Sequence, residues 1–388
     1  MRLSFFHFLF FAAPLFLQAE SDAPQTQQEA QQELPYDRDR ELFLEPESMS
    51  ASPLLQGLEK LAQTSDEERI KSPQEVQQEL DRDEKLFEEA QEMFNPWYTG
   101  PLLTGSAHMM PPGSANIQPY IFVTDNYAIW DNERKSVSIP DKWNLNPQFL
   151  IQTGITSWLD ILLAIQGNVN WQKDKCSGGF GDTSLSLGFC LLEESLYRPA
   201  MKLTVSETFP TGRYQNLDPK KIGLDGTGAG SYQTGFGFRI SKLVFWSYKH
   251  PLNLRGSYTY TVPSDVHVKG FNSYGGGYGT RGKVKPGNSS QADVAFEYSF
   301  TQRWVFATDL VYVWANRTTF SGKLGTTADH TPASVGYGSS DQLSLAPAIE
   351  YNWNANLGFL MGAWFDVYGR NTSKFVSGIV SVTYSFSW

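Results

Sequence analysis

The sequence predicts an all-β protein, a transmembrane antiparallel β-barrel of about 12 strands that follows a partly helical or disordered acidic arm. Aromatic residues make up 14% of the chain and glycine occurs 33 times, while the mean hydropathy is only -0.36. Each membrane-spanning helix would need about 20 consecutive apolar residues. Beyond its N-terminal segment, the chain has no such run. A barrel strand needs only one apolar face, so this composition fits a barrel.

Alternation of apolar and polar residues is the second observation. In residues 291–300 every even-numbered position is apolar or aromatic, and the opposite face carries Asp293 and Glu297. Residues 357–368 show the same division. Because successive side chains point to opposite faces of a strand, one face of each strand is expected in lipid and the other in the lumen.

Twelve segments fit this pattern, and their connections alternate between short and long. Short connections are expected on the periplasmic side and long ones outside, with both chain ends of the barrel periplasmic. The expected strands are 116–125, 143–155, 158–171, 183–192, 199–208, 231–240, 252–262, 291–300, 304–314, 341–351, 357–368 and 374–388. The long external connections are 126–142, 209–230, 263–290 and 315–340.

The N-terminal part of the chain differs from the rest. Residues 1–19 resemble a secretory signal peptide, with Arg2 before an apolar run and a small-residue cleavage site. Residues 20–95 contain 21 acidic and 7 basic residues, whereas residues 96–388 contain 20 and 23. We therefore expect a signal peptide, an acidic low-complexity periplasmic arm, and a barrel in the outer membrane of a Gram-negative-type envelope.

Two short amphipathic helices are expected in the arm, one around Leu54 to Leu61 and one around Leu86 to Met93, because leucines and other apolar residues recur there at helical spacing. The remainder of the arm has too few apolar residues to fold alone. A solvated spacer is favoured over an arm that docks on a periplasmic partner or plugs the barrel mouth.

The end of the chain is the most specific feature of the sequence. Tyr384, Phe386 and the terminal Trp388 alternate with serine and threonine in the last segment. This pattern resembles the C-terminal signature of outer-membrane barrels. The resemblance implies that the barrel-assembly machinery recognises the last strand.

Alternation also predicts charged residues inside the lumen. Acidic ones lie on the later strands and basic ones on the middle strands, which would give an electrostatically polarised pore with facing walls. The alternative is that they form salt-bridged pairs that fill a narrow interior. The residues are Lys202, Arg239, Arg255, Asp293, Glu297, Asp309, Glu350 and Asp366.

No catalytic, metal or cofactor site is expected. The histidines have neither metal-ligand spacing nor a serine and an acid in a nucleophile-like arrangement. Cys176 and Cys190 lack a CxxC spacing, and a single disulfide between them remains open. The low share of charged residues, 19%, argues against a nucleic-acid binder.

Several short motifs resemble the outer-membrane family named for a MetA pathway of phenol degradation. They occur in order over about residues 118–388. Their order and spacing make the resemblance more specific than any one of the short motifs alone. The motifs are Gly154-Ile155-Thr156 with Leu159-Asp160, Gly179-Phe180-Gly181-Asp182, Phe209-Pro210-Thr211-Gly212, and Gly226-Thr227-Gly228 before Ser231-Tyr232. The family implies a barrel for small, often aromatic solutes and no catalytic residues, and the acidic arm departs from its pattern.

These observations predict a channel through which small solutes, aromatic or hydrophobic ones among them, diffuse passively across the outer membrane. Its partners would be outer-membrane lipids and a small-molecule solute. The alternative is a structural or adhesin-like barrel that acts through its long external loops, such as the glycine-rich loop 270–282.

Overall fold

The computed structural model describes residues 72–94, 99–244 and 250–388. The expected signal peptide and the expected first helix of the arm lie outside these residues. Residues 84–388 belong to one compact unit, and residues 72–83 belong to another.

Helix α2 spans Pro73–Phe94 and includes the predicted amphipathic segment. It begins with a capping box, because the Glu75 carboxylate accepts from the Ser72 N–H at 2.9 Å and the Glu75 N–H donates to Ser72 Oγ at 3.3 Å. No helix in the described part of the chain is long and apolar enough to cross a membrane.

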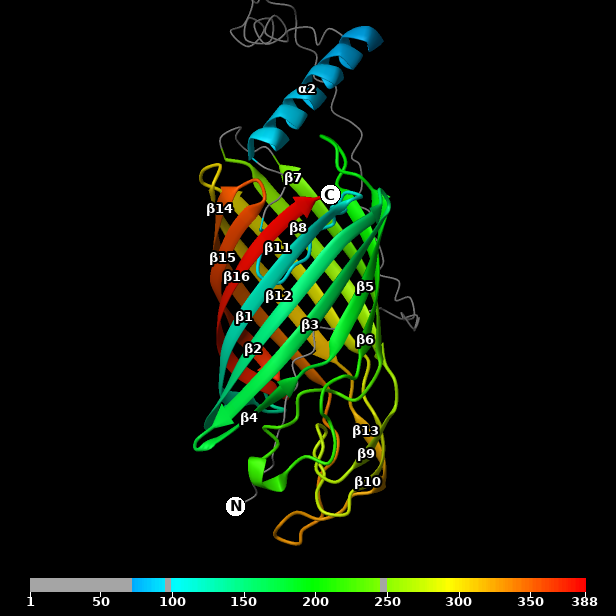
Figure 1. The fold of residues 1–388 in the computed structure, drawn as a ribbon, viewed down its shortest axis with the longest axis vertical. Helices are drawn as coiled ribbons and strands as arrows, with labels where there is room; N and C mark the ends of the chain where they lie inside the picture. Colours follow the sequence, from blue (N-terminus) through cyan, green and yellow to red (C-terminus); the bar gives the residue numbers. More distant parts are fainter. Residues whose placement is uncertain (1–71, 95–98, 245–249) are drawn as a thin grey trace, which may run out of the picture. The chain divides into compact units, whose positions relative to one another are not determined.

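The fold is a closed antiparallel barrel (Figure 1). Its wall runs β2-β1-β16-β15-β14-β12-β11-β8-β7-β6-β5-β3, and β2 pairs with β3 to close it. The predicted barrel of 12 strands is confirmed. The wall strands are β1 Ser114–Trp130, β2 Ser136–Thr156, β3 Leu159–Gln172, β5 Thr183–Leu192, β6 Ala200–Phe209, β7 Gln233–Val244, β8 Leu252–Pro263, β11 Ser289–Ser299, β12 Trp304–Ala315, β14 Ser340–Asn354, β15 Leu357–Arg370 and β16 Thr372–Ser387.

The two faces of the wall strands differ as the alternation predicts. On β11, Val294 is 64% exposed, whereas its neighbours Asp293 and Glu297 are 3% and 0% exposed. Met361 on β15 is 66% exposed. Acids inside and large apolar side chains outside are the arrangement of a wall whose outer face meets lipid.

The last strand closes the barrel. β16 pairs with β1 from Ser387 opposite Ser114 to Thr372 opposite Trp130. The rings of Tyr384 and Phe386 stack with centroids 5.8 Å apart, and the Trp388 N–H donates to the carbonyl of Gly113. The aromatic residues of the proposed assembly signal therefore lie in the strand that completes the hydrogen-bonded ring of strands.

One wall strand is interrupted. β4, Lys175–Phe180, pairs with the outer part of β3, and β5 pairs with the inner part, so β4 and β5 are two halves of one strand. Cys176 and Cys190 lie in opposite halves and are both free. Fourteen residues of strand separate them by about 45 Å, whereas a disulfide needs Cα atoms within about 7 Å. The structure therefore has no disulfide between Cys176 and Cys190.

The long external connections contain more regular structure than expected. Strands β1 and β2 extend into the predicted loop 126–142, leaving only a short turn. β9 Val266–Lys269, β10 Arg281–Lys285 and β13 Thr319–Lys323 form a separate three-stranded sheet. Val266, Val268, Val284 and Tyr274 form a buried apolar cluster there. The glycine-rich loop, expected to be a mobile surface, therefore packs part of its length into an external core.

Residues 99–113, called the lumen segment below, run inside the barrel before β1 begins (Figure 1). Leu102 packs in one cluster with Tyr120 and Phe122 of β1 and Leu360 of β15. Its path requires glycine at position 154 on β2, since a Cβ there would meet the carbonyl oxygens of residues 110 and 111 at 2.1 and 2.3 Å. The lumen segment is a part of the fold that the sequence patterns did not predict.

A closed barrel has no free edge at which unfolding can start, so we expect the purified protein to keep its barrel in detergent until heated. Unheated and boiled samples should then run at different mobilities on a gel. Identical mobility at every temperature, together with a soluble periplasmic pool, would contradict the closed barrel.

Replacing Gly154 by alanine should destabilise the protein by about 1–3 kcal/mol, because the new methyl group would overlap backbone atoms of the lumen segment. The temperature of the gel-mobility shift measures this loss. Gly378→Ala on β16 is the matched control, since nothing lies within 4 Å of a Cβ at that position. Equal transition temperatures for the two variants would show that the lumen segment does not press on Gly154.

Candidate functional site

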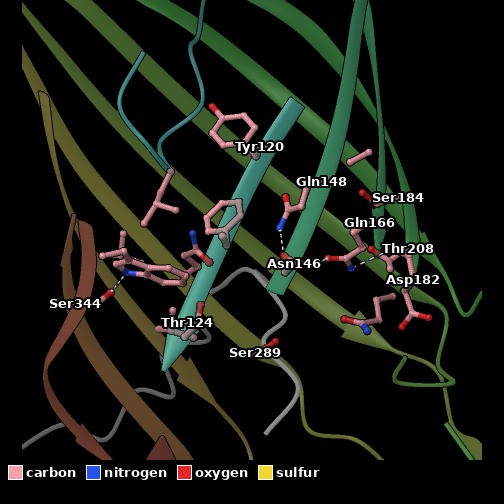
Figure 2. Close-up of a pocket in the computed structure, with 18 of the residues that line it drawn as sticks. Tyr120, Thr124, Asn146, Gln148, Gln166, Asp182, Ser184, Thr208, Ser289 and Ser344 are labelled. Atoms are coloured by element: carbon pink, nitrogen blue, oxygen red, sulfur yellow. Dashed lines mark hydrogen bonds between the residues drawn. The ribbon is translucent and has the colours of Figure 1, made fainter. Parts of the chain in front are cut away.

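The barrel encloses a chamber of about 900 Å³. Residues 99–106 and 108–110 of the lumen segment line one end of it, and residues of the external connections, such as Thr227, Gly287 and Tyr337, line the other. Strands β1, β2 and β3 supply much of the wall. Figure 2 shows side chains of β1 and β2, Tyr120 and Gln148 among them, pointing into this space.

The lumen segment is held by inward-facing side chains of the wall. The Gly100 N–H donates to Glu350 Oε2 at 3.2 Å, and the Thr104 N–H donates to Asp309 Oδ1 at 2.8 Å. Farther along, the Met110 N–H donates to Asp160 Oδ2 at 3.3 Å. Glu350 and Asp309, both predicted to line a pore, thus act as acceptors for backbone amides that have no strand partner, and so does Asp160, which was not predicted.

Two buried ion pairs lie in the same layer. Lys202 Nζ lies 2.8 Å from Asp160 Oδ2 and donates to the carbonyl of His108 at 2.6 Å. Arg255 donates two hydrogen bonds to Glu297, from Nε to Oε2 at 2.6 Å and from Nη2 to Oε1 at 3.0 Å. In both pairs the acid and base come from wall strands that lie close together. For Lys202, Arg255 and Glu297 the predicted facing walls of opposite charge are replaced by local pairs, because a nearby partner offsets the cost of burying a charge.

The three remaining predicted charges have separate surroundings. Asp293 accepts from Ser257 Oγ at 2.5 Å. Asp366 accepts from the indole N–H of Trp130 and from the Phe375 N–H, so it satisfies backbone where the pairing of β15 with β16 ends. Asp366 is not among the residues that line the chamber.

Arg239, the last of these predicted residues, does line the chamber. Its guanidinium lies against Gly105, where a Cβ would approach Nη1 to 2.5 Å. Among the residues that the structure describes, it makes no hydrogen bond or salt bridge, and the carboxylates of Asp160 and Asp293 act on it only through their charge. Of the three predicted bases, Arg239 is therefore the one without a salt bridge among the described residues, and it lies at the floor of the chamber.

Six carboxamide side chains form what we call the amide ladder. Asn144, Asn146 and Gln148 extend from β2 and Gln166, Asn168 and Asn170 from β3. Gln148 Nε2 donates to Asn146 Oδ1 at 2.6 Å, and Asn144 Nδ2 donates to Asn170 Oδ1 at 2.9 Å (Figure 2 shows the first). This neutral polar wall was missed because only charged residues were assigned to the lumen; the alternation on β2 and β3 could have found it.

The outer end of the chamber is fixed by two aspartates. Asp341 accepts from Arg134 and from Arg370 Nε, the latter at 2.8 Å. Asp182 lies at the interruption between β4 and β5 and accepts from the Gly212 N–H at 2.8 Å and the Ala229 N–H at 2.7 Å. Asp182 thereby ties the long connection 210–232 to the wall.

Glu194, in the turn between β5 and β6, anchors the lumen segment at the periplasmic side. Its Oε2 lies 2.7 Å from His108 Nε2, and its Oε1 accepts from the Leu243 N–H. Burial disfavours the charged carboxylate, but the bonds from His108 and Leu243 and the nearby Lys242 outweigh it and hold the pKa of Glu194 below its usual value.

Within residues 72–94, 99–244 and 250–388, no group of three or more histidine, cysteine or acidic side chains is placed to hold a metal ion. The polar groups of the chamber serve as hydrogen-bond partners for one another and for the lumen segment. This chemistry suits binding or passage of a solute.

Comparison with known proteins identifies the family. The family model described as "Putative MetA-pathway of phenol degradation" matches residues 126–381. None of the curated proteins compared with the chain matches it.

A solved structure of an outer membrane channel has a similar fold. The COG4313 outer membrane channel from Pseudomonas putida F1 has a TM-score of 0.55 at 16% identity, over 73% of this chain and 98% of that one. The translocator domain of the autotransporter NalP from Neisseria meningitidis has a TM-score of 0.40 at 12% identity, over 79% and 98%. With the family match over most of the barrel, the chain is an outer-membrane β-barrel that belongs to the family of the MetA pathway of phenol degradation.

Proposed function

We propose that this protein is an outer-membrane channel through which small solutes diffuse passively. The observation that carries the proposal is the chamber of about 900 Å³, whose lining runs from the external connections to the lumen segment. Such a volume is in the range of small-molecule sites. The similarity in fold to an outer membrane channel supports the same role.

For a solute to pass to the periplasm, the lumen segment must move aside. It fills the periplasmic half of the barrel but makes no strand pairing beyond one isolated bridge between Pro112 and Gly154, as far as the described residues show. Its anchors are single hydrogen bonds to side chains such as Asp309 and Ser241. The segment can therefore shift without opening the wall.

The family name points to aromatic solutes, and the chamber has aromatic side chains to receive them. Tyr120, Phe122 and Trp364 line it. We include small aromatic compounds among the solutes of the channel on this basis.

A second candidate function rests on the external sheet of β9, β10 and β13. Its own apolar cluster gives the loops a fixed shape, which an adhesin-like surface needs. Removing β9 and β10 while keeping the wall strands would separate the functions, because an adhesin would lose its activity and a channel would keep its conductance.

Single-channel recording tests the channel directly. We expect stepwise currents from the purified protein in planar bilayers, and larger steps from Asp309→Ala, which removes the acceptor of the Thr104 N–H. Asp329→Ala, in an exposed external turn, changes the charge equally and should leave the current unchanged. A bilayer that stays silent with both the wild type and Asp309→Ala would reject the proposal.

The Glu194 anchor should depend on pH. Because its pKa is lowered in the folded state, its stabilising contribution is complete above the ordinary glutamate pKa of about 4.3 and is lost as pH falls through the folded-state value. The protection of the Ala107 and His108 amides from hydrogen exchange, relative to their intrinsic exchange rates at each pH, should therefore fall in acid.

Glu194→Gln should remove most of this pH dependence and raise exchange already at neutral pH. Its neighbour Glu193 is exposed, so Glu193→Gln is the control and should behave as the wild type. If the Glu194 variant keeps the full acid response, another group anchors the segment.

A further inference from the structure

We propose that the chamber binds uncharged ring polyols, such as small saccharides and cyclitols, along the amide ladder. This inference rests on the proposed channel function and specifies the solute that the channel selects. It extends beyond the aromatic solutes that the family name suggests.

The first argument is the arrangement of the three strands that face the chamber. Tyr120 lies opposite Gln148, and Phe122 lies opposite Asn146, in the register of β1 with β2. Gln148 in turn lies opposite Gln166 on β3. An aromatic strip thus runs directly beside two rows of carboxamides.

A saccharide ring needs both kinds of surface. Its hydroxyl groups donate and accept hydrogen bonds, as carboxamides do, and the C–H faces of the ring pack on aromatic rings. The rings of Tyr120 and Phe122 stack with centroids 5.8 Å apart, and they line the chamber with the 7% and 9% of their surface that stays exposed. A hydrocarbon would use the aromatic strip but would leave the amides without partners.

The second argument is the unused hydrogen-bonding capacity of the ladder. Gln148 Oε1, Asn144 Oδ1 and Asn168 Nδ2 have no protein partner within the described residues, although the other polar atoms of these amides bond along the ladder. None of the three is a buried unsatisfied atom, so each is accessible from the chamber. Two acceptors and one donor are thus available to a solute.

Spacing supports the same class of solute. Inward-facing rungs recur every two residues, about 6.6 Å apart, a distance comparable with the width of a six-membered ring that carries hydroxyl groups. A ring polyol can therefore exchange hydrogen bonds from one rung to the next as it moves toward the lumen segment.

The charge distribution favours a neutral solute on the ladder itself. No charged side chain lies among its rungs, and the charges of Asp182 and Asp341 are occupied by the N–H groups and arginines described above. Lys142 is the next inward-facing residue of β2, two positions before Asn144, and stands at the outer end of the ladder, while Arg239 lines the chamber from β7. Between Asn144 and Gln148 a neutral ring therefore meets no charged side chain.

Saturation-transfer NMR on the detergent-solubilised protein tests this inference with myo-inositol and glucose as probes. Cyclohexanol, which has the same ring size and one hydroxyl, is the reference solute. We expect both polyols to bind saturably and at least about fivefold more tightly than cyclohexanol, which corresponds to one or more hydrogen bonds. Equal affinity for cyclohexanol, or no polyol binding, would overturn the inference.

Variants locate the binding. Gln148→Leu and, separately, Asn168→Leu should each weaken polyol binding about fivefold while leaving cyclohexanol unaffected. Gln302→Leu, the same exchange in an exposed periplasmic turn, is the matched control. The heat-dependent gel shift shows which variants fold. If a variant does not fold, the comparison of polyols with cyclohexanol on the wild-type protein still tests the inference. Unchanged polyol affinity in both folded ladder variants would overturn the assignment to the ladder.

Binding in solution does not depend on transport, so the two proposals fail separately. Polyol binding without conductance would reject the channel and keep the site. Conductance without polyol binding would keep the channel and reject this solute class.

Discussion

Hydrogen bonds between inward-facing side chains and the backbone of the lumen segment determine which part of the barrel interior is filled and which part stays open as a chamber. A backbone amide shielded from water needs an acceptor, and residues 99–113 bring a series of them into the barrel without a strand partner. Glu350, Asp309, Ser241 and Asp160 supply the acceptors. Each bond to a charged group contributes about 1.5–3 kcal/mol, so the segment and the wall specify each other.

This arrangement divides the lumen into two regions with different chemistry. Near the periplasm, acids and bases are buried, paired and covered by the segment, as in the Lys202–Asp160 pair. Toward the outside, the wall presents neutral amides such as Asn144 and Asn170 around a chamber. Charges lie beside the lumen segment and at the outer end, where Asp182 and Asp341 are bonded, and the amide ladder between the two ends is neutral.

The strands could be predicted from the sequence because a wall between lipid and lumen imposes a period of two on every side chain it contains. All twelve expected strands occur, and Asp309 and Glu297 point inward as alternation requires. The partners of these acids could not be predicted, since they depend on which distant segments meet inside the barrel. The lumen segment and strands β9, β10 and β13 were missed because these elements do not have one face in lipid and the other in water, so their sequences need not alternate.

The lumen segment and the wall are held by different kinds of bonds, and this difference decides which can move. Wall strands share continuous backbone ladders, such as the twelve paired positions of β12 with β14, and opening one ladder exposes many polar groups to lipid at once. The segment is attached mainly through separate side-chain bonds, which can be broken one at a time and replaced by bonds to water or to a solute. A solute that supplies its own hydroxyl groups replaces such bonds as it passes, so the chemistry that binds a ring polyol in the chamber also lowers the cost of displacing the segment below it.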